Sequence, residues 1–573
     1  MPIPSTLTGG TLADVDLELT RGAWPPDLRG EMVISGPEPA KDLDYCLFGF
    51  GAITRISLQP GTHGAGSNRF ALRSQVIDTP SKRLYDAAPE VFTSNTFGYS
   101  SPFGMPNQAN TAPLPWGDRL FATWDVGRPV EVDPITLQFL GDVGYASEWG
   151  PATFGMGGVL PFYFSSAHPI VDPLRDLLFT VKLMPTNDGR MQLVVVAWSG
   201  EGGALRTWPV AGGTVIGSAH TLSQTRDWLI LADSGNFKSD MGEMAGGPRT
   251  VTIDEGAPVY LIRKDQLLAT APGTPFTPRF SAISPTTGHF FGVWDDSDGI
   301  RVLFEHMDLM DLGFQLRAGD VDANGHPISP AATGFYNMAM APNTISEWTF
   351  DPASGAATRT AWFRDDWTFN LELSAMDWST EGLSHPTLHH VAYQGYRPDA
   401  VAGRALDLYR AQGRVGPLPE AETPGVLATF RRDGLELAGT WTYHDCGDHI
   451  TSPIFAPRRA GARSTSSRYA GTEPGGHDGY VVLPVLSDDG LRVEVFDAAH
   501  VSRGPLAVLE APGTWCLPAV LHAAWMPEVD AVVDAERIEF ADDLDSGQVD
   551  RLDAELAEVV RRVADDLLSS RVA

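Results

Sequence analysis

Cysteine is scarce in this sequence, which holds three, Cys46, Cys446 and Cys516, among 573 residues. Three thiols are an odd number and too few to stabilise a chain of this length through disulfide bonds. Each is expected to be a small packed side chain rather than a ligand or a nucleophile. We therefore expect a reduced, cytoplasmic protein.

Basic residues are also few, because 41 Lys and Arg stand against 72 Asp and Glu and give a formal net charge of −31. No basic patch interrupts this acidic excess over any long stretch. Nucleic acids and anionic membrane headgroups bind through clustered positive charge, so we expect neither as a partner.

Long apolar runs are missing as well. None approaches the ~18 to 20 residues needed to cross a bilayer, and the start of the chain lacks the basic and apolar regions of an export signal. We therefore expect no transmembrane segment. No phosphate-binding loop, dinucleotide fingerprint or serine nucleophile elbow occurs in a strand-to-helix context, which leaves nucleotide-binding and hydrolase functions without support.

Short strand-like runs fill most of the chain instead, for example 177–183, 191–198, 258–264 and 480–490. The 59 glycines and 44 prolines supply the tight turns that such runs need. The pattern predicts an all-β, antiparallel fold, in which several strand–turn–strand pairs are typical of propeller blades. No strict repeat of roughly 40 to 50 residues accompanies them, and the length leaves one large domain or two open.

Two segments depart from the β pattern. Residues 311–345 are irregular and are predicted to form a long inserted loop over one face, where such loops act as lids or pocket walls. Near the C-terminus, apolar residues recur at three- and four-residue spacing and predict an amphipathic helix: Val549, Leu552, Leu556, Val559, Val563 and Leu567. We expect this helix to pack on the outside of the domain, with an oligomer contact as the alternative.

Four histidines stand in separate strand-like settings: His168 in FSSAHPIVDP, His220 in GSAHTLSQ, His306 in VLFEHMDL and His522 in AVLHAAWM. They can meet only if the fold brings the ends of different elements to one axis, which excludes a finger, a ribbon or an HExxH site. Four imidazole nitrogens in an octahedron leave two open positions on a metal. Imidazole ligands alone do not select the metal.

The segments around these histidines resemble the carotenoid cleavage oxygenase family, which includes apocarotenoid and lignostilbene dioxygenases and the retinoid isomerase of the visual cycle. The similar segments occur in the family's order, from about residue 27 to about residue 530: NTAPLPWGDRLFATWDVGRPVEVDPITLQFLG, SSAHPIVDP, SAHTLSQTRDWLIL, FEHMDLMD, TSPIFAPR and LHAAWMP.

The resemblance implies a seven-bladed β-propeller with a loop and helical cap over one face. Its axis would hold Fe(2+) on His168, His220, His306 and His522. Residues 1–535 would form the propeller with its cap loops and central metal site, and residues 536–573 a C-terminal helical extension. The implied activity is the cleavage of a carbon–carbon double bond in an apolar conjugated substrate by O2, which gives two carbonyl products.

In this family, glutamates accept hydrogen bonds from the ligand imidazoles, as metal-bound histidines usually require. The similar positions here hold Asp125, Glu381 and Ser452. Asp125 is shorter than glutamate by one methylene, and Ser452 accepts a hydrogen bond but brings no negative charge. The site would therefore carry fewer formal charges around iron. The alternative for each residue is an ordinary polar side chain in a loop or turn.

Two aromatic residues bear on the substrate. Stilbene-cleaving members position a phenol with a tyrosine and a lysine; Tyr99 matches the tyrosine, but Trp124 occupies the lysine position. Tryptophan cannot supply the cation that steadies a phenolate, so we favour an apocarotenoid or carotenoid over a stilbene-type aryl alkene. The alternative for both residues is aromatic packing in a pocket or core.

Three other interpretations stay open. An isomerase or ester-cleaving relative would use the same metal without adding oxygen, and a non-catalytic propeller would keep only the scaffold. A separate zinc site could form in HDCGDH at 444–449, although carboxylates and a lone thiol in a glycine turn are more typical of a solvated loop.

Overall fold

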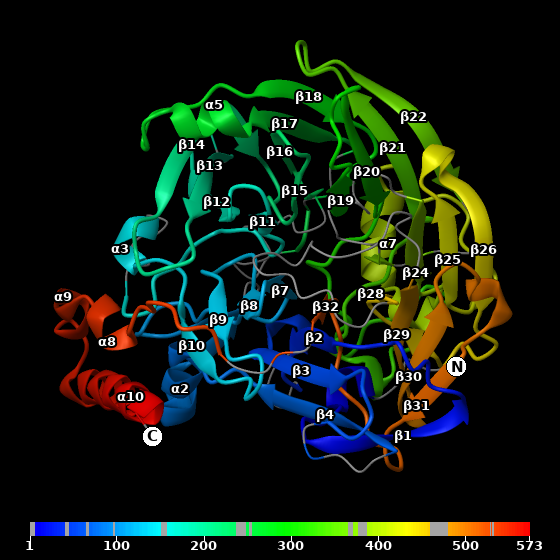
Figure 1. The fold of residues 1–573 in the computed structure, drawn as a ribbon, viewed down its shortest axis with the longest axis horizontal. Helices are drawn as coiled ribbons and strands as arrows, with labels where there is room; N and C mark the ends of the chain where they lie inside the picture. Colours follow the sequence, from blue (N-terminus) through cyan, green and yellow to red (C-terminus); the bar gives the residue numbers. More distant parts are fainter. Residues whose placement is uncertain are drawn as a thin grey trace.

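Antiparallel sheets arranged around a central axis dominate the computed structural model (Figure 1). The structure describes residues 6–572 except for 40–44, 63, 65–67, 96–97, 151–157, 189, 236–247, 251, 253–254, 365–368, 370, 376–386, 459–478, 528 and 530–531. The predicted all-β class is confirmed.

Five four-stranded antiparallel sheets follow one another along the described chain as blades. They comprise β7 (Ala112–Trp116), β8 (Arg119–Thr123), β9 (Val130–Val132) and β10 (Phe139–Asp142); β11 (Ile170–Asp172), β12 (Leu177–Pro185), β13 (Met191–Trp198) and β14 (Arg206–Val215); β15 (Leu222–Gln224), β16 (Trp228–Ala232), β17 (Ala257–Arg263) and β18 (Arg279–Ile283); β19 (His289–Gly292), β20 (Ile300–His306), β21 (Thr344–Phe350) and β22 (Ala357–Arg364); β23 (Glu372–Ala375), β24 (Leu388–Tyr393), β25 (Val426–Arg431) and β26 (Glu436–Thr442).

The first strand of a blade lies near the axis and the last lies at the rim. Figure 1 shows β11, β15 and β19 toward the centre and β14, β18 and β22 on the outside. Burial agrees, since β11 and β15 are buried throughout whereas β22 alternates between exposed and half-buried residues. The short inner strands lie close together around the axis. Side chains at the ends of these strands can therefore contact one another at the axis.

A ten-stranded sheet joins the two ends of the chain. Its strands are β1 (Val15–Gly22), β2 (Glu31–Pro37), β3 (Gly51–Ser57), β4 (Arg69–Val76), β27 (His449–Ile450), β28 (Ile454–Pro457), β29 (Gly479–Ser487), β30 (Gly490–Asp497), β31 (Ala507–Glu510) and β32 (His522–Met526). The N-terminal β1 pairs with both β4 and β31, and β2 pairs with β32. The blue and orange strands in Figure 1 therefore lie side by side and close the ring.

The predicted count of seven blades is wrong, because the described strands form five four-stranded blades and one ten-stranded sheet. The physical reason is the pairing of β1 with β31. Continuous hydrogen bonding across that pair merges the N-terminal and C-terminal strands into one sheet. The sequence carries no strict repeat from which this merging could have been foreseen.

The described chain also contains helices and one small hairpin in addition to these sheets. The hairpin pairs β5 (Thr93–Asn95) with β6 (Gly98–Ser100). The described helices are α1 (Thr6–Gly9), α2 (Pro80–Ala87), α3 (Ala146–Trp149), α5 (Lys264–Ala269), α7 (Gly403–Arg410), α8 (Phe540–Asp543), α9 (Ser546–Val549) and α10 (Ala554–Val572). Of these, no helix is both long and apolar enough to span a bilayer.

The predicted loop at 311–345 is irregular up to the start of β21 at Thr344. It is nevertheless well packed, since Phe314, Leu316 and Phe335 are buried in one cluster with residues of α7. A backbone hydrogen bond of 2.9 Å from Met338 to the carbonyl of Ala400 ties the loop to the segment that leads into α7. Loop and helix share this core with the ten-stranded sheet, since Leu17 of β1 and Val493 of β30 belong to the same cluster.

The predicted C-terminal helix appears in part as α10, which contains Leu556 to Leu567, whereas Val549 ends the short α9 and Leu552 lies between the two helices. The short α8 precedes them. The apolar stripe of α10 is buried, including Val559, Val563 and Leu567, and the helix packs on α2 and α8 at the edge of the ring (Figure 1). Asp543 in α8 pairs with Arg128 at 2.7 Å and fixes the segment to the first blade. The division into residues 1–535 and 536–573 stays a prediction.

Candidate metal centre

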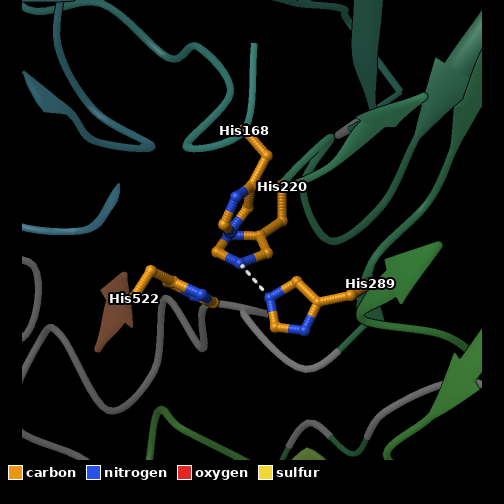
Figure 2. Close-up of side chains that lie close together, drawn as sticks. All are labelled: His168, His220, His289 and His522. Carbon is orange, nitrogen blue, oxygen red and sulfur yellow. Dashed lines mark hydrogen bonds between the residues drawn. The ribbon is translucent and has the colours of Figure 1, made fainter. Parts of the chain in front are cut away.

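Four imidazoles converge at the axis of the ring, and they come from His168, His220, His289 and His522 (Figure 2). One nitrogen of each lies within 4.8 Å of the corresponding nitrogen of every other. Among the described residues, this is the one group of three or more His, Cys, Asp or Glu side chains with that geometry.

Each of these histidines stands at the start of an inner strand. His168 and His220 precede β11 and β15 by two residues, and His289 and His522 are the first residues of β19 and β32. The chain therefore enters each of these strands at the axis and carries a histidine there. Four short segments that are distant in sequence thus place one imidazole each at the same point.

Backbone hydrogen bonds hold three of the four positions in register. The amide of His168 donates to the carbonyl of His220 at 3.0 Å, and the amide of Leu222 donates back to His168 at 3.2 Å. The hydroxyl of Thr221 then donates to the carbonyl of Gly288 at 2.9 Å, directly before His289. The positions of the three imidazoles therefore depend on one another and not on flexible loops.

The remaining predicted ligand, His306, is not part of the cluster. It lies at the end of β20, the second strand of its blade, where Nδ1 faces the carbonyl of Thr286 at 3.1 Å and Nε2 faces the hydroxyl of Ser346 at 2.5 Å. Burial lowers the pKa of His306 to about 4. His306 is a satisfied core histidine, because the second strand of a blade stands one strand away from the axis.

His289 takes the place predicted for His306. A signal for it exists in the sequence, since His289 opens the strand-like run 289–294, in the way that His168 and His220 come just before theirs. His306 instead closes the run 301–306. A search of the sequence for histidines at the start of strand-like runs would therefore have selected His289 and not His306.

Burial disfavours the charged form of three of the four imidazoles. Burial lowers the pKa of His168 and His522 well below the usual value, and the other histidines of the cluster lower both further. Burial also lowers the pKa of His289. Neutral imidazoles keep a nitrogen lone pair for a metal, so the electrostatics of the site favour a cation in its centre.

Two carboxylates contact the outer nitrogens of the cluster. The oxygens of Asp125 lie 2.9 and 3.0 Å from Nδ1 of His220, and an oxygen of Glu305 lies 3.4 Å from Nδ1 of His289. A carboxylate only accepts, so Nδ1 of His220 carries the proton and donates it to Asp125. Asp125 therefore lies where the sequence predicted a hydrogen-bond acceptor for a ligand imidazole.

The inner nitrogens of the cluster face one another. A hydrogen bond of 3.3 Å joins Nε2 of His220 to Nε2 of His289 (Figure 2), so one of these two nitrogens carries a proton that a bound metal would displace. Nε2 of His168 is buried without a hydrogen-bond partner among the described residues. A cation between these atoms would satisfy all three, so the residues present fit a metal.

The other predicted site residues have different outcomes. Ser452 is buried and accepts a hydrogen bond of 3.0 Å from the amide of Ala523, so it contacts the backbone beside His522. Trp124 is buried directly before Asp125. Glu381 and the side chain of Tyr99 lie outside the described residues. Any role of Trp124 and Tyr99 toward a substrate stays a prediction.

The HDCGDH segment does not form a second metal cluster in the described part of the chain. The carboxylate of Asp448 pairs with Arg492 at 2.5 Å, and His449 is buried with Nε2 3.2 Å from the amide nitrogen of Gln394. Burial lowers the pKa of His449 to about 3. These side chains serve the packing between β27 and its neighbours.

Comparisons with known proteins agree with this geometry. The sequence model of the family described as retinal pigment epithelial membrane protein matches residues 8–527. A resveratrol cleavage oxygenase of Chaetomium globosum is 25% identical over 93% of this chain and 88% of its own length. An apocarotenoid-15,15'-oxygenase of Synechocystis is 28% identical over 28% of this chain and 32% of its own.

Solved structures show the same fold. A variant of the Synechocystis apocarotenoid oxygenase has a TM-score of 0.59 at 17% identity, with 91% of this chain and 98% of that chain covered. The lignostilbene dioxygenase of Pseudomonas brassicacearum has a TM-score of 0.58 at 17% identity, with 92% and 100% covered. Because the family match spans most of the sequence, the chain belongs to the retinal pigment epithelial membrane protein family, the carotenoid cleavage oxygenases that its motifs predicted.

Proposed function

We propose that this protein is a non-heme iron(II) dioxygenase that cleaves a carbon–carbon double bond of an apolar conjugated substrate into two carbonyl products. The observation that carries the proposal is the cluster of four imidazoles on the axis, backed by Asp125 and Glu305, in a chain of this family. O2 would be the second substrate.

His168, His220, His289 and His522 would hold the metal. When bound, iron(II) would supply a redox-active centre with coordination positions left open for dioxygen beside the substrate. The chain itself orients the imidazoles through the strand starts, and it places Asp125 beside Nδ1 of His220 and Glu305 beside Nδ1 of His289. Imidazoles do not by themselves distinguish iron from other first-row metals, so the choice of iron comes from family membership.

An apocarotenoid or carotenoid is the substrate class that we favour. Trp124, which lies directly before the Asp125 that supports His220, offers a buried aromatic surface and no cation. An extended polyene requires apolar contact alone, whereas a phenolate requires a positive charge nearby. The relative named an apocarotenoid oxygenase is consistent with this choice.

A stilbene-type aryl alkene is the second candidate. The observation in its favour is the relative named a resveratrol cleavage oxygenase, because that similarity extends over 93% of this chain. A phenol could be bound in its neutral form, for which a hydrogen-bond acceptor would suffice.

The test is to load the purified protein with iron(II) and incubate it under 18O2 with an apocarotenoid aldehyde and, separately, with a hydroxylated stilbene. Two carbonyl products that carry label from 18O2 support a dioxygenase, and the preferred substrate decides between the two classes. Conversion without label would identify an isomerase or ester-cleaving relative. A protein that binds no metal and converts neither substrate would be a non-catalytic propeller and would contradict the proposal.

A further inference from the structure

A second layer of side chains stands behind His289. Glu305 lies on β20 directly opposite His289 in the pairing of β19 with β20, and its carboxylate is fully buried. One oxygen is 3.4 Å from Nδ1 of His289, and the other is 3.7 Å from Nε2 of His389. Neither oxygen has a closer hydrogen-bond donor among the described residues.

His389 belongs to a different blade. It lies on β24, and its Nε2 is also 3.1 Å from the hydroxyl of Ser374 on β23. Its imidazole is fully buried. The contact between Glu305 and His389 therefore joins the blade that carries His289 to the next blade of the ring.

A buried carboxylate between two buried imidazoles is costly unless a positive charge compensates it. A divalent metal on Nε2 of His289 would supply that charge, because the bound imidazole becomes a stronger donor toward Glu305. The position of Glu305 is thus explained by a cation on the axis.

The two carboxylates at the site differ in their surroundings. Asp125 contacts His220 with both oxygens, and its side chain is 15% exposed. Glu305 is fully buried and shares its oxygens between two histidines from neighbouring blades. Glu305 therefore also contacts His389, whereas both oxygens of Asp125 face His220.

We propose that Glu305 and His389 form a positioning pair that fixes the tautomer and orientation of His289, so that its Nε2 faces the metal. This proposal rests on the proposed function, since it assumes a metal on the four histidines. Its consequence is that a side chain without contact to the metal, on a neighbouring blade, controls the affinity and geometry of the metal site.

The experiment uses Co(II) as the probe, because its absorption bands report ligand geometry independently of activity. The metal-free full-length protein is titrated with Co(II) in competition with a chelator, and spectra are recorded for wild type and four variants. Glu305→Gln keeps the shape but leaves one acceptor oxygen for two imidazoles. His389→Leu removes the polar contact to Glu305, and His389→Gln restores a polar group close to the position of Nε2.

His390→Leu is the matched control. His390 is the next residue on β24 and is equally buried, but its Nδ1 contacts the hydroxyl of Thr429 at 3.0 Å and not Glu305. Thermal unfolding of each variant separates loss of folding from loss of metal. If Glu305→Gln does not fold, the comparison of His389→Leu with His389→Gln and His390→Leu carries the test.

We expect Glu305→Gln to weaken Co(II) binding about 10- to 100-fold and to shift the absorption bands. His389→Leu should weaken binding by a smaller factor, His389→Gln should recover most of it, and His390→Leu should match the wild type. Equal affinity and spectra for wild type, Glu305→Gln and His389→Leu would overturn this inference alone. A wild type that binds no metal would overturn the proposed function instead.

Discussion

His220 and His289 face each other across the axis with their Nε2 atoms 3.3 Å apart, while the Nδ1 atom of each faces a carboxylate. The two Nε2 atoms form a hydrogen bond, and a metal ion bound between them would take the place of its proton. The cluster could therefore hold a metal ion.

Separate substitutions of His289 and His306 test which of the two is the metal ligand. The structure places His289 in the cluster, whereas the sequence predicted His306. His289→Ala should abolish metal binding and activity, because it removes one of four ligands. His306→Gln should keep the metal and most activity, and should destabilise the fold by about 1 to 3 kcal/mol through its hydrogen bonds to Thr286 and Ser346. Metal analysis and urea unfolding measure the two effects. Loss of metal only in His306→Gln would refute the assignment of His289.

Asp125 supports His220 with both oxygens, so its charge should matter for the metal. We expect Asp125→Asn to lower metal affinity about 10- to 100-fold, because the amide cannot keep the same charge-assisted acceptor for Nδ1. Chelator competition measures the change. Asp118→Asn is a suitable control, since Asp118 is exposed in the turn between β7 and β8. An Asp125→Asn variant with wild-type affinity would exclude a supporting role.

Metal removal should destabilise the folded protein. A ligand that binds only the native state stabilises it by about 2.7 kcal/mol at 100 times its dissociation constant. The melting temperature should therefore fall on chelation and recover when iron(II) is returned. His326→Ala, which alters a histidine 75% exposed, should keep this shift, whereas His289→Ala should lose it. If neither the chelator nor iron(II) changes the melting temperature, the cluster does not bind a metal.

Acid should destabilise the fold partly through His449. Burial, with a further contribution from Arg397, lowers its pKa to about 3 in the folded state, while the unfolded chain keeps a value of about 6.5. Its contribution to stability is complete above about pH 6.5 and is lost as the pH falls toward 3, because only the unfolded state binds the proton there. The slope from this one group is about 1.4 kcal/mol per pH unit.

His449→Gln should therefore lose stability less steeply on acidification than the wild type does. Urea unfolding between about pH 6.5 and pH 4 measures both slopes. The comparison concerns the slope and not the absolute stability, because the variant also changes the contact with Gln394. Parallel curves for the two proteins would show that His449 titrates normally in the folded state.

Local pattern was enough for much of this protein. Short apolar runs between turn residues predicted antiparallel strands, because side-chain alternation and turn formation depend on only a few neighbouring residues. The spacing of Val559, Val563 and Leu567 predicted the helix that became α10 for the same reason. His168, His220 and His522, and the family itself, were found because each stands in a recognisable segment.

The tertiary structure decided what depends on distance between segments. His289 and His306 lie in similar strand-like runs, and only the order of strands within a blade places one at the axis and the other one strand away. Pairing of β1 with β31 decided the number of separate sheets, and the contact of Glu305 with His389 arises where two blades meet. A sequence specifies which residues can bind a metal, but strand register and closure of the ring determine which of them meet.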